Sequence, residues 1–226
     1  MFAEDRQVLL APRGEDGHNP CAMSQASDVA KKLLPKWAKR FILLRLRGVH
    51  KRYDHLRSHP SRIFLEREIL PWIAAHYERV LFVGTAPYTH QFERIFRRSR
   101  DHYTTIDPVR GTETWGARHH IVAPLQEIAL HRPKGHFDCV VLNGIFGFGI
   151  DDTEGQRAAI KILHDTIAPG GLLLVGWNTN LMLDLEDLGL FEPYFSKEVE
   201  GLPWPHRTRF PLPETHTYDF YTRRAD

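Results

Sequence analysis

The sequence predicts an α/β fold built on an open, mostly parallel sheet with helices on both of its faces. Short apolar runs, each ending at a small or polar residue, alternate along the chain with segments of helical period. Strands buried on both faces form such continuous apolar runs, and their alternation with helices is typical of βαβ units. The C-terminal region differs, because two β-rich runs joined by a short loop predict an antiparallel pair.

Five segments have the pattern of buried parallel strands. They span residues 79–83, 103–106, 119–122, 137–142 and 172–177, and they end at Gly84, Asp107, Ala123, Asn143 and Asn178. The antiparallel pair is expected over 207–210 and 216–221. Apolar residues at helical spacing predict helices at about 61–76, 88–98, from 125, at 153–167 and at 183–188. A tight turn is expected at 168–171, where the sequence is Ala-Pro-Gly-Gly.

The N-terminal quarter of the chain has a different composition. Residues 1–25 lack an apolar period and predict a mobile tail, whereas 26–59 have the pattern of an amphipathic helix. Ten basic residues and one acid lie between Lys31 and Arg57, a local charge of +9 in a chain whose net charge is +2. We therefore expect a tail (1–25), a basic helical cap (26–76) and a core (77–226). Segment 31–57 fits a lid that attracts an anionic substrate, a surface for RNA or an acidic membrane, or a solvated helix face.

Composition excludes several classes of protein. Two cysteines in 226 residues are too few for a disulfide scaffold. No stretch of about 18 apolar residues predicts a membrane-spanning helix. The first residues lack the apolar region of a signal peptide, so we expect a cytoplasmic protein. Cys-x-x-Cys does not occur, the adjacent His119 and His120 would point to opposite faces of a strand, and no metal is expected.

The ends of the first two strands carry the strongest functional signal. Ligands of open α/β sheets bind beyond the carboxyl ends of the strands. Small residues follow the first strand at Gly84, Thr85 and Ala86, where a ligand can approach the backbone. Asp107 follows the second strand, 23 positions after Gly84, and a carboxylate there can accept both hydroxyl hydrogens of a ribose. The spacing therefore predicts a nucleoside-bearing cofactor.

Four segments carry a resemblance to a known family. Residues 79–178, with the terminal pair to 222, resemble class I S-adenosylmethionine-dependent methyltransferases in VLFVGTAPYT (80–89), YTTIDP (103–108), FDCVVLNGIFGFG (137–149) and IAPGGLLLVGWN (167–178). The resemblance implies a Rossmann-like three-layer α/β/α sandwich. Its seven-stranded, mostly parallel sheet would have an antiparallel last strand, and the helical cap would precede it. The chain departs from the family in having one glycine in the first loop and no acid after the third strand.

The resemblance also implies an activity and its residues. It implies methyl transfer from S-adenosylmethionine to oxygen or nitrogen of a small-molecule acceptor such as a sugar, glycolipid or secondary metabolite. Cofactor contacts are expected at Gly84, Thr85, Ala86, Tyr88, Asp107, Pro108, Ala123, Leu125 and Asn143, and substrate contacts at Phe146, Phe148, Trp177 and Asn178. Asn143 would face the methyl group, and Asp151 and His206 are candidate bases for a hydroxyl acceptor. Two other functions stay open: a non-catalytic binding protein with this fold, and an RNA methyltransferase that uses the basic helix.

Overall fold

The structure is a computed structural model that describes residues 35, 38, 58–97 and 102–225. Apart from Pro35 and Ala38, these residues belong to one compact unit, which begins at Gly48. The predicted tail (1–25) and nearly all of the predicted basic helix (26–59) lie outside the described residues, so the division of the chain at residue 76 stays a prediction. Among the described residues, no helix has both the length and the apolar character needed to cross a membrane.

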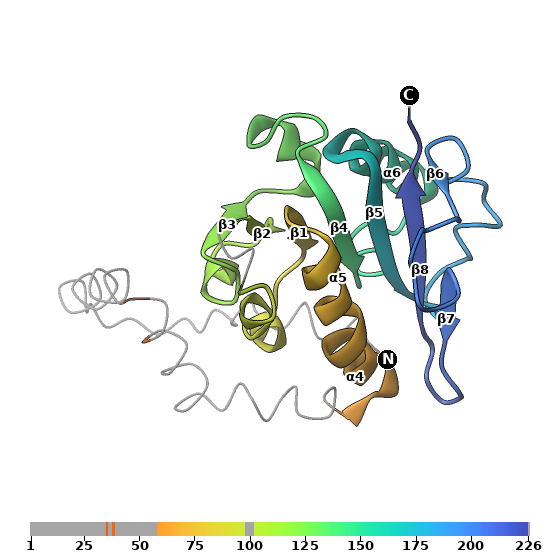
Figure 1. Cartoon of the computed structure of the whole chain (residues 1–226), viewed down its shortest axis with the longest axis horizontal. Helices are drawn as coiled ribbons and strands as arrows, with labels where there is room; N and C mark the ends of the chain where they lie inside the picture. The colour runs from red at the N-terminus through yellow and green to blue at the C-terminus, as the bar shows by residue number, and fades with distance from the viewer. Residues whose placement is uncertain (1–34, 36–37, 39–57, 98–101, 226) are drawn as a thin grey trace, which may run out of the picture. The chain divides into compact units, whose positions relative to one another are not determined.

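One twisted sheet runs through this unit (Figure 1). Its strands are β1 (Val80–Val83), β2 (Tyr103–Asp107), β3 (His119–Val122), β4 (Phe137–Asn143), β5 (Ile167–Asn178), β6 (Phe195–Ser196), β7 (Arg207–Arg209) and β8 (His216–Arg223). The order is β3-β2-β1-β4-β5-β8-β6, and β7 pairs with β8 away from this path. The first five strands are parallel, and β8 is antiparallel to β5, β6 and β7. The predicted parallel sheet with an antiparallel last strand is therefore confirmed, and β7 and β8 form the expected antiparallel pair. The short strand β6 was not predicted, and the sheet has eight strands rather than seven.

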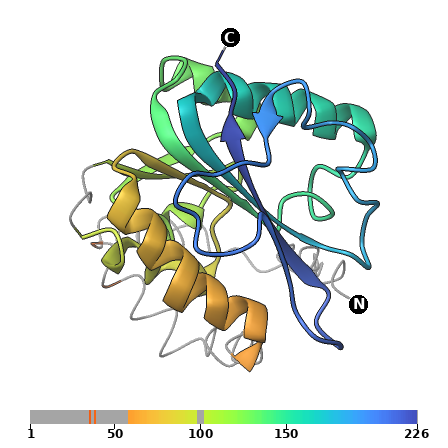
Figure 2. The same cartoon turned by 45° about the vertical axis from the view of Figure 1, so that its right-hand side comes forward.

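Helices cover both faces of the sheet, as Figures 1 and 2 show. The first is continuous through α4 (Pro60–Phe64), a π-helical turn (Leu65–Ile69) and α5 (Leu70–His76). Pro71 lacks an N–H and its ring would meet the carbonyl of Arg67 in a regular α-helix, so the wider π turn just before it accommodates the proline. On the opposite face lies α6 (Thr153–Thr166), which begins where the Asp152 side chain accepts a hydrogen bond from the Gly155 N–H.

The two faces of the sheet form separate hydrophobic cores. Alternation along each strand sends successive side chains to opposite faces. One core joins α4, the π turn and α5 to the sheet through residues such as Leu65, Ile73, Phe82 and Phe220. The other contains the buried residues of α6 and the alternate strand positions. This is the expected three-layer arrangement, and it leaves the carboxyl ends of β1 to β5 together at one edge.

Several predicted helices are wrong. The segment expected at 88–98 contains short 3₁₀ turns at Pro87–Thr89 and Phe92–Arg94, and 183–188 forms turns. Thr89 explains the first difference: its hydroxyl donates to the Ala86 carbonyl and accepts from the Ala86 N–H, which favours a tight turn over a regular helix. The stretch that begins at Leu125 is also 3₁₀, over Leu125–Leu130.

The predicted turn at 168–171 is instead part of β5. Phe137 pairs with Ile167 and Cys139 with Leu172, so the intervening residues of β5 form a bulge opposite β4. Gly170 has a φ of +77°, and a Cβ at Gly171 would come within 2.8 Å of the Asp138 carbonyl oxygen. Glycine at both positions thus allows the chain to bulge without leaving the sheet.

Candidate active site

The loop after β1 and the end of β2 meet around one buried carboxylate. Asp107 is 6% exposed. Its Oδ2 accepts a hydrogen bond from the Thr85 N–H (2.8 Å), and its Oδ1 accepts one from the Val109 N–H (2.9 Å). Each carboxylate oxygen can accept more than one hydrogen bond, so both keep a lone pair for hydroxyl hydrogens. The predicted neighbours Gly84, Thr85 and Asp107 are thus brought together.

Two further features shape the surroundings of Asp107. Gly84 has a φ of +83°, which suits glycine, and a Cβ there would lie 2.8 Å from the Ile145 Cδ1. Val109 and Val122 are 55% and 44% exposed. Val122 pairs with Asp107 in the β2–β3 register, and Val109 lies two residues after it. An exposed apolar surface therefore adjoins the carboxylate.

The ends of β4, β5 and β8 are joined by a polar bridge made of Asn143, His216 and Asn178. His216 Nε2 lies 3.0 Å from Asn143 Oδ1, and His216 Nδ1 lies 3.0 Å from Asn178 Oδ1. The Asn143 side chain crosses β5 at Gly176, where a Cβ would overlap its Oδ1 and lie 2.9 Å from His216 Nε2. Gly176 therefore provides the space that lets β4 reach β8 over the intervening strand.

The imidazole of His216 is neutral at physiological pH. Burial lowers the pKa of His216 to about 4, and the positive charges of Arg62 and His59 contribute. A neutral imidazole has one N–H donor and one bare nitrogen acceptor.

We expect His216→Gln to flatten the pH dependence of stability between pH 6.5 and 4. In this window the unfolded chain protonates its histidine while the folded protein does not, so lowering the pH favours unfolding. Across this pH range the single histidine would lower the free energy of unfolding of the wild-type protein by roughly 3 kcal/mol at most. We expect a fall of about 1–2 kcal/mol, because the residue is partly accessible to solvent. Urea unfolding of both proteins at pH 7 and 4.5 measures the difference. Equal losses of stability in the two proteins would contradict the expectation.

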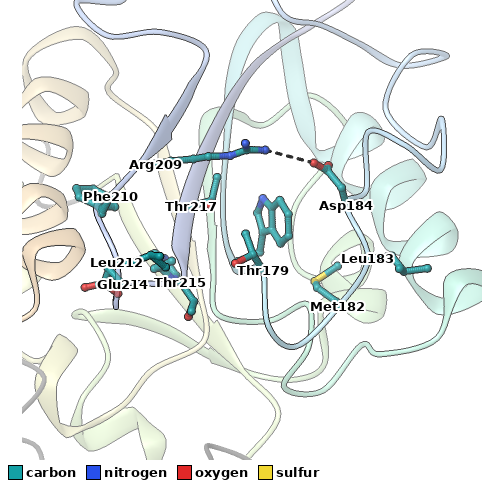
Figure 3. A pocket seen from close by; sticks show the side chains of 12 residues that line it. Thr179, Met182, Leu183, Asp184, Arg209, Phe210, Leu212, Glu214, Thr215 and Thr217 are labelled. Atoms are coloured by element: carbon teal, nitrogen blue, oxygen red, sulfur yellow. Dashed lines mark ion pairs between the residues drawn. The ribbon is translucent and has the colours of Figure 1, made fainter.

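A cavity of about 500 Å³ opens beside this bridge. Its lining includes Trp177, Met182 and Leu183 from the end of β5 and the loop after it. Arg209, Leu212 and His216 line it from β7, the following loop and β8. Figure 3 shows the Arg209 side chain directed toward Asp184. Arg209 Nη2 lies 3.7 Å from Asp184 Oδ2. Leu183 and Leu212 are 72% and 89% exposed, so the cavity has an apolar rim.

The other predicted site residues have varied surroundings. The Tyr88 ring lies 4.2 Å from the guanidinium carbon of Arg62, whose Nη2 donates to the Tyr88 carbonyl. Asp151 is exposed and accepts a hydrogen bond from the Gly149 N–H in the loop before α6. Ala86 and Phe148 are half-buried and Pro108 is exposed; Ala123, Leu125, Phe146 and Trp177 are buried in the core on the α6 face.

His206 is not brought to the strand ends. Its carbonyl accepts a hydrogen bond from the Phe220 N–H, four residues along β8 from His216, which corresponds to about 13 Å along a strand. Its Nε2 lies 3.3 Å from Glu186 Oε1. His206 therefore belongs to a cluster of charged residues at the side of β8, away from Asn143.

That cluster is centred on Arg207. Its guanidinium donates two hydrogen bonds to Asp219, from Nε (2.6 Å) and Nη2 (2.8 Å), and two to Asp184. Asp219 is 1% exposed and also accepts from Trp177 Nε1 (2.8 Å). Burial by itself would raise the pKa of Asp184, but the hydrogen bond from Arg207 holds it below its ordinary value. These contacts fix β7 and the 179–184 loop, which form two walls of the cavity.

His216 is the residue that sequence reasoning missed. It follows a proline-rich loop, and its hydrogen-bond partners Asn143 and Asn178 lie 73 and 38 positions earlier in the chain. The strand pattern predicted that 216–221 pairs with 207–210, whereas it is the pairing of β8 with β5 that places His216 opposite Asn178. Within the described residues, no group of three or more His, Cys, Asp or Glu is arranged to hold a metal ion.

Comparisons with known proteins identify the fold. No family model matches the sequence, and no curated protein matches it. Among solved structures, the 1,6-didemethyltoxoflavin-N1-methyltransferase of Burkholderia thailandensis is similar over 95% of this chain and 95% of its own, with 14% identity and a TM-score of 0.54. A TehB-like methyltransferase of Corynebacterium glutamicum is similar over 79% of this chain and 97% of its own, with 15% identity and a TM-score of 0.54. The N-methyltransferase NodS of Bradyrhizobium japonicum is similar over 75% of this chain and 99% of its own, with 14% identity and a TM-score of 0.53.

These likenesses agree with the strand order and with the antiparallel β8. They confirm at the level of the fold the resemblance that the strand-end segments indicated. The chain has the fold of the class I S-adenosylmethionine-dependent methyltransferases.

Proposed function

We propose that the protein transfers a methyl group from S-adenosylmethionine to a small-molecule acceptor. The observation that carries this proposal is the arrangement of Asp107. Asp107 is the last residue of β2, and its buried carboxylate accepts hydrogen bonds from two backbone N–H groups. It lies at the edge where open α/β sheets bind ligands.

The residues around Asp107 fit the adenosine part of the cofactor. The carboxylate oxygens would accept the two ribose hydroxyl hydrogens, and the exposed side chains of Val109 and Val122 would pack against the adenine. Gly84 would bring the backbone close to the methionine part, with Thr85 beside it.

The other half of the site would receive the acceptor. The cofactor supplies a methyl group already activated on a sulfonium, so the protein mainly has to bring the acceptor close and in line. Asn143 lies at the end of β4, next to β1, and would face the methyl group. The cavity reaches His216, which contacts Asn143, and its volume of about 500 Å³ suits a small molecule.

Calorimetric titration tests the cofactor half of the proposal. We expect S-adenosylmethionine and S-adenosylhomocysteine to bind with micromolar dissociation constants, and NAD⁺ not to bind. Release of S-adenosylhomocysteine in pools of small amines, phenols and sugars then tests the acceptor half. A well-folded sample that binds neither cofactor form would overturn the proposal.

A further inference from the structure

We propose that His216 is a positioning residue that turns the carbonyl oxygen of Asn143 toward the transferring methyl group, so that the site takes acceptors that donate a hydrogen bond. The inference rests on the proposed function and deepens it. It follows from the hydrogen bonds of the Asn143–His216–Asn178 bridge.

The two ring nitrogens of His216 cannot both donate. Each lies 3.0 Å from an asparagine amide oxygen, and satisfying both oxygens would require a protonated ring. The ring is half-buried, and burial, with the positive charge of Arg62, lowers its pKa and so opposes protonation. One of the two asparagines therefore presents its NH₂ group to the ring, which a half-turn of its amide achieves.

The surroundings of Asn178 indicate which amide makes this turn. The Thr215 hydroxyl donates to Asn178 Oδ1 at 3.5 Å, so this oxygen has a donor besides the His216 ring. Within the part of the chain that the structure describes, Asn143 Oδ1 has a single partner, His216 Nε2. Asn178 thus keeps its oxygen toward the ring and His216 carries its proton on Nδ1. Asn143 then donates its NH₂ group to the bare Nε2.

This arrangement determines what Asn143 offers to an acceptor. With its NH₂ group held by His216, its carbonyl oxygen faces the open edge of the sheet. An amine N–H or a hydroxyl O–H can donate to that oxygen, whereas a carboxylate would be repelled by it. During transfer the lone pair of the acceptor forms the new bond to carbon, the S–C bond breaks with its electrons left on sulfur, and the acceptor gains positive charge before losing its proton to solvent. The carbonyl dipole favours that charge.

The cofactor analogue sinefungin provides a probe without a known acceptor, because it carries an amine at the position of the transferred methyl group. An outward carbonyl oxygen would accept a hydrogen bond from this amine. We expect the wild-type protein to bind sinefungin at least fivefold more tightly than S-adenosylhomocysteine. Asn143→Ala and His216→Leu should bring this ratio close to one. In His216→Gln the ratio should persist, because one glutamine amide can accept from Asn143 and donate to Asn178.

Tyr218→Phe is the matched control. Tyr218 packs against the His216 ring (4.7 Å between centroids), and its hydroxyl donates to the Ser61 carbonyl. The variant therefore disturbs the surroundings of the ring without removing a hydrogen bond of Asn143. Its affinity ratio should equal that of the wild type. A wild-type ratio of one or below, or a ratio that His216→Leu leaves intact, would overturn the inference. Failure of the proposed function is distinct, because then neither compound binds the wild-type protein.

Imidazole ¹⁵N chemical shifts give an independent readout that needs no ligand. We expect His216, identified by the signals lost in His216→Gln, to be neutral at pH 7 with its proton on Nδ1. A proton on Nε2, or a charged ring, would contradict the assigned orientation whatever the protein binds.

Discussion

Replacing Asp107 by alanine is expected to lower the affinity for S-adenosylhomocysteine at least 100-fold. The variant removes the carboxylate that we propose accepts two ribose hydroxyl hydrogens, and a hydrogen bond to a charged group contributes about 1.5–3 kcal/mol. Two such bonds correspond to a factor of roughly 100 or more in the dissociation constant. The side chain also fixes the Thr85 and Val109 N–H groups, so the loops on both sides lose a common anchor. Calorimetric titration measures the change.

Two further variants separate binding from folding. Asp107→Asn keeps the size of the side chain and one carbonyl oxygen, so we expect an intermediate affinity. Asp152→Ala removes the N-cap of α6, which accepts from the Gly155 N–H. It should lower the free energy of unfolding by about 1 kcal/mol and leave cofactor affinity unchanged. A folded Asp107→Ala protein with wild-type affinity would show that the ligand binds elsewhere.

Arg207→Met is expected to lower the free energy of unfolding by about 3–5 kcal/mol, because it leaves the buried Asp219 carboxylate without its counter-charge. Asp219 is 1% exposed, and among the described residues its remaining side-chain hydrogen-bond donor would be Trp177 Nε1. Asp184 would lose its two bonds from the same guanidinium. Urea unfolding followed by circular dichroism and tryptophan fluorescence measures the loss.

Arg209→Met is the matched control, because it removes the same charge from the same strand, β7. Arg209 lies two residues further along β7, its side chain is 61% exposed and it is 3.7 Å from Asp184. Exposed ion pairs contribute about 0–1 kcal/mol, so Arg209→Met should change stability little. If both variants lost a similar free energy of unfolding, the burial of Asp219 would not be the reason for the loss in Arg207→Met. A double variant, Arg207→Met with Asp219→Leu, should recover part of the lost stability because no buried charge is left.

Four of the five parallel strands, β1, β2, β4 and β5, could be predicted from the sequence because they are buried largely on both faces, as Val80–Val83 shows. The same reasoning placed Asp107 beside Gly84, since parallel strands bring their carboxyl ends to one edge. The helix expected at 88–98 depended on apolar spacing alone. There the hydrogen bonds of Thr89 favour a short turn. The strand pattern therefore carried more information than the helical pattern in this chain.

Side-chain partners at long range could not be predicted in the same way. Asn143 and Asn178 were expected at the site, but the imidazole that joins them comes from β8 and depends on the register with β5. The candidate base His206 has a side-chain type suited to the role, and only the paired strands show that it lies beside Glu186 instead. Residue type and sequence spacing carry no information on such positions until the sheet is aligned.

The place of β8 between β5 and β6 has a consequence for the order of folding. The edge of β5, with the apolar run Leu172–Val175, has no partner on that side until the last strand of the sequence pairs with it. Unpaired apolar edges are where folding chains associate with one another. The same pairing delivers His216 to Asn143. Protection of the chain from aggregation and completion of the polar bridge are therefore achieved in one step, when β8 enters the sheet.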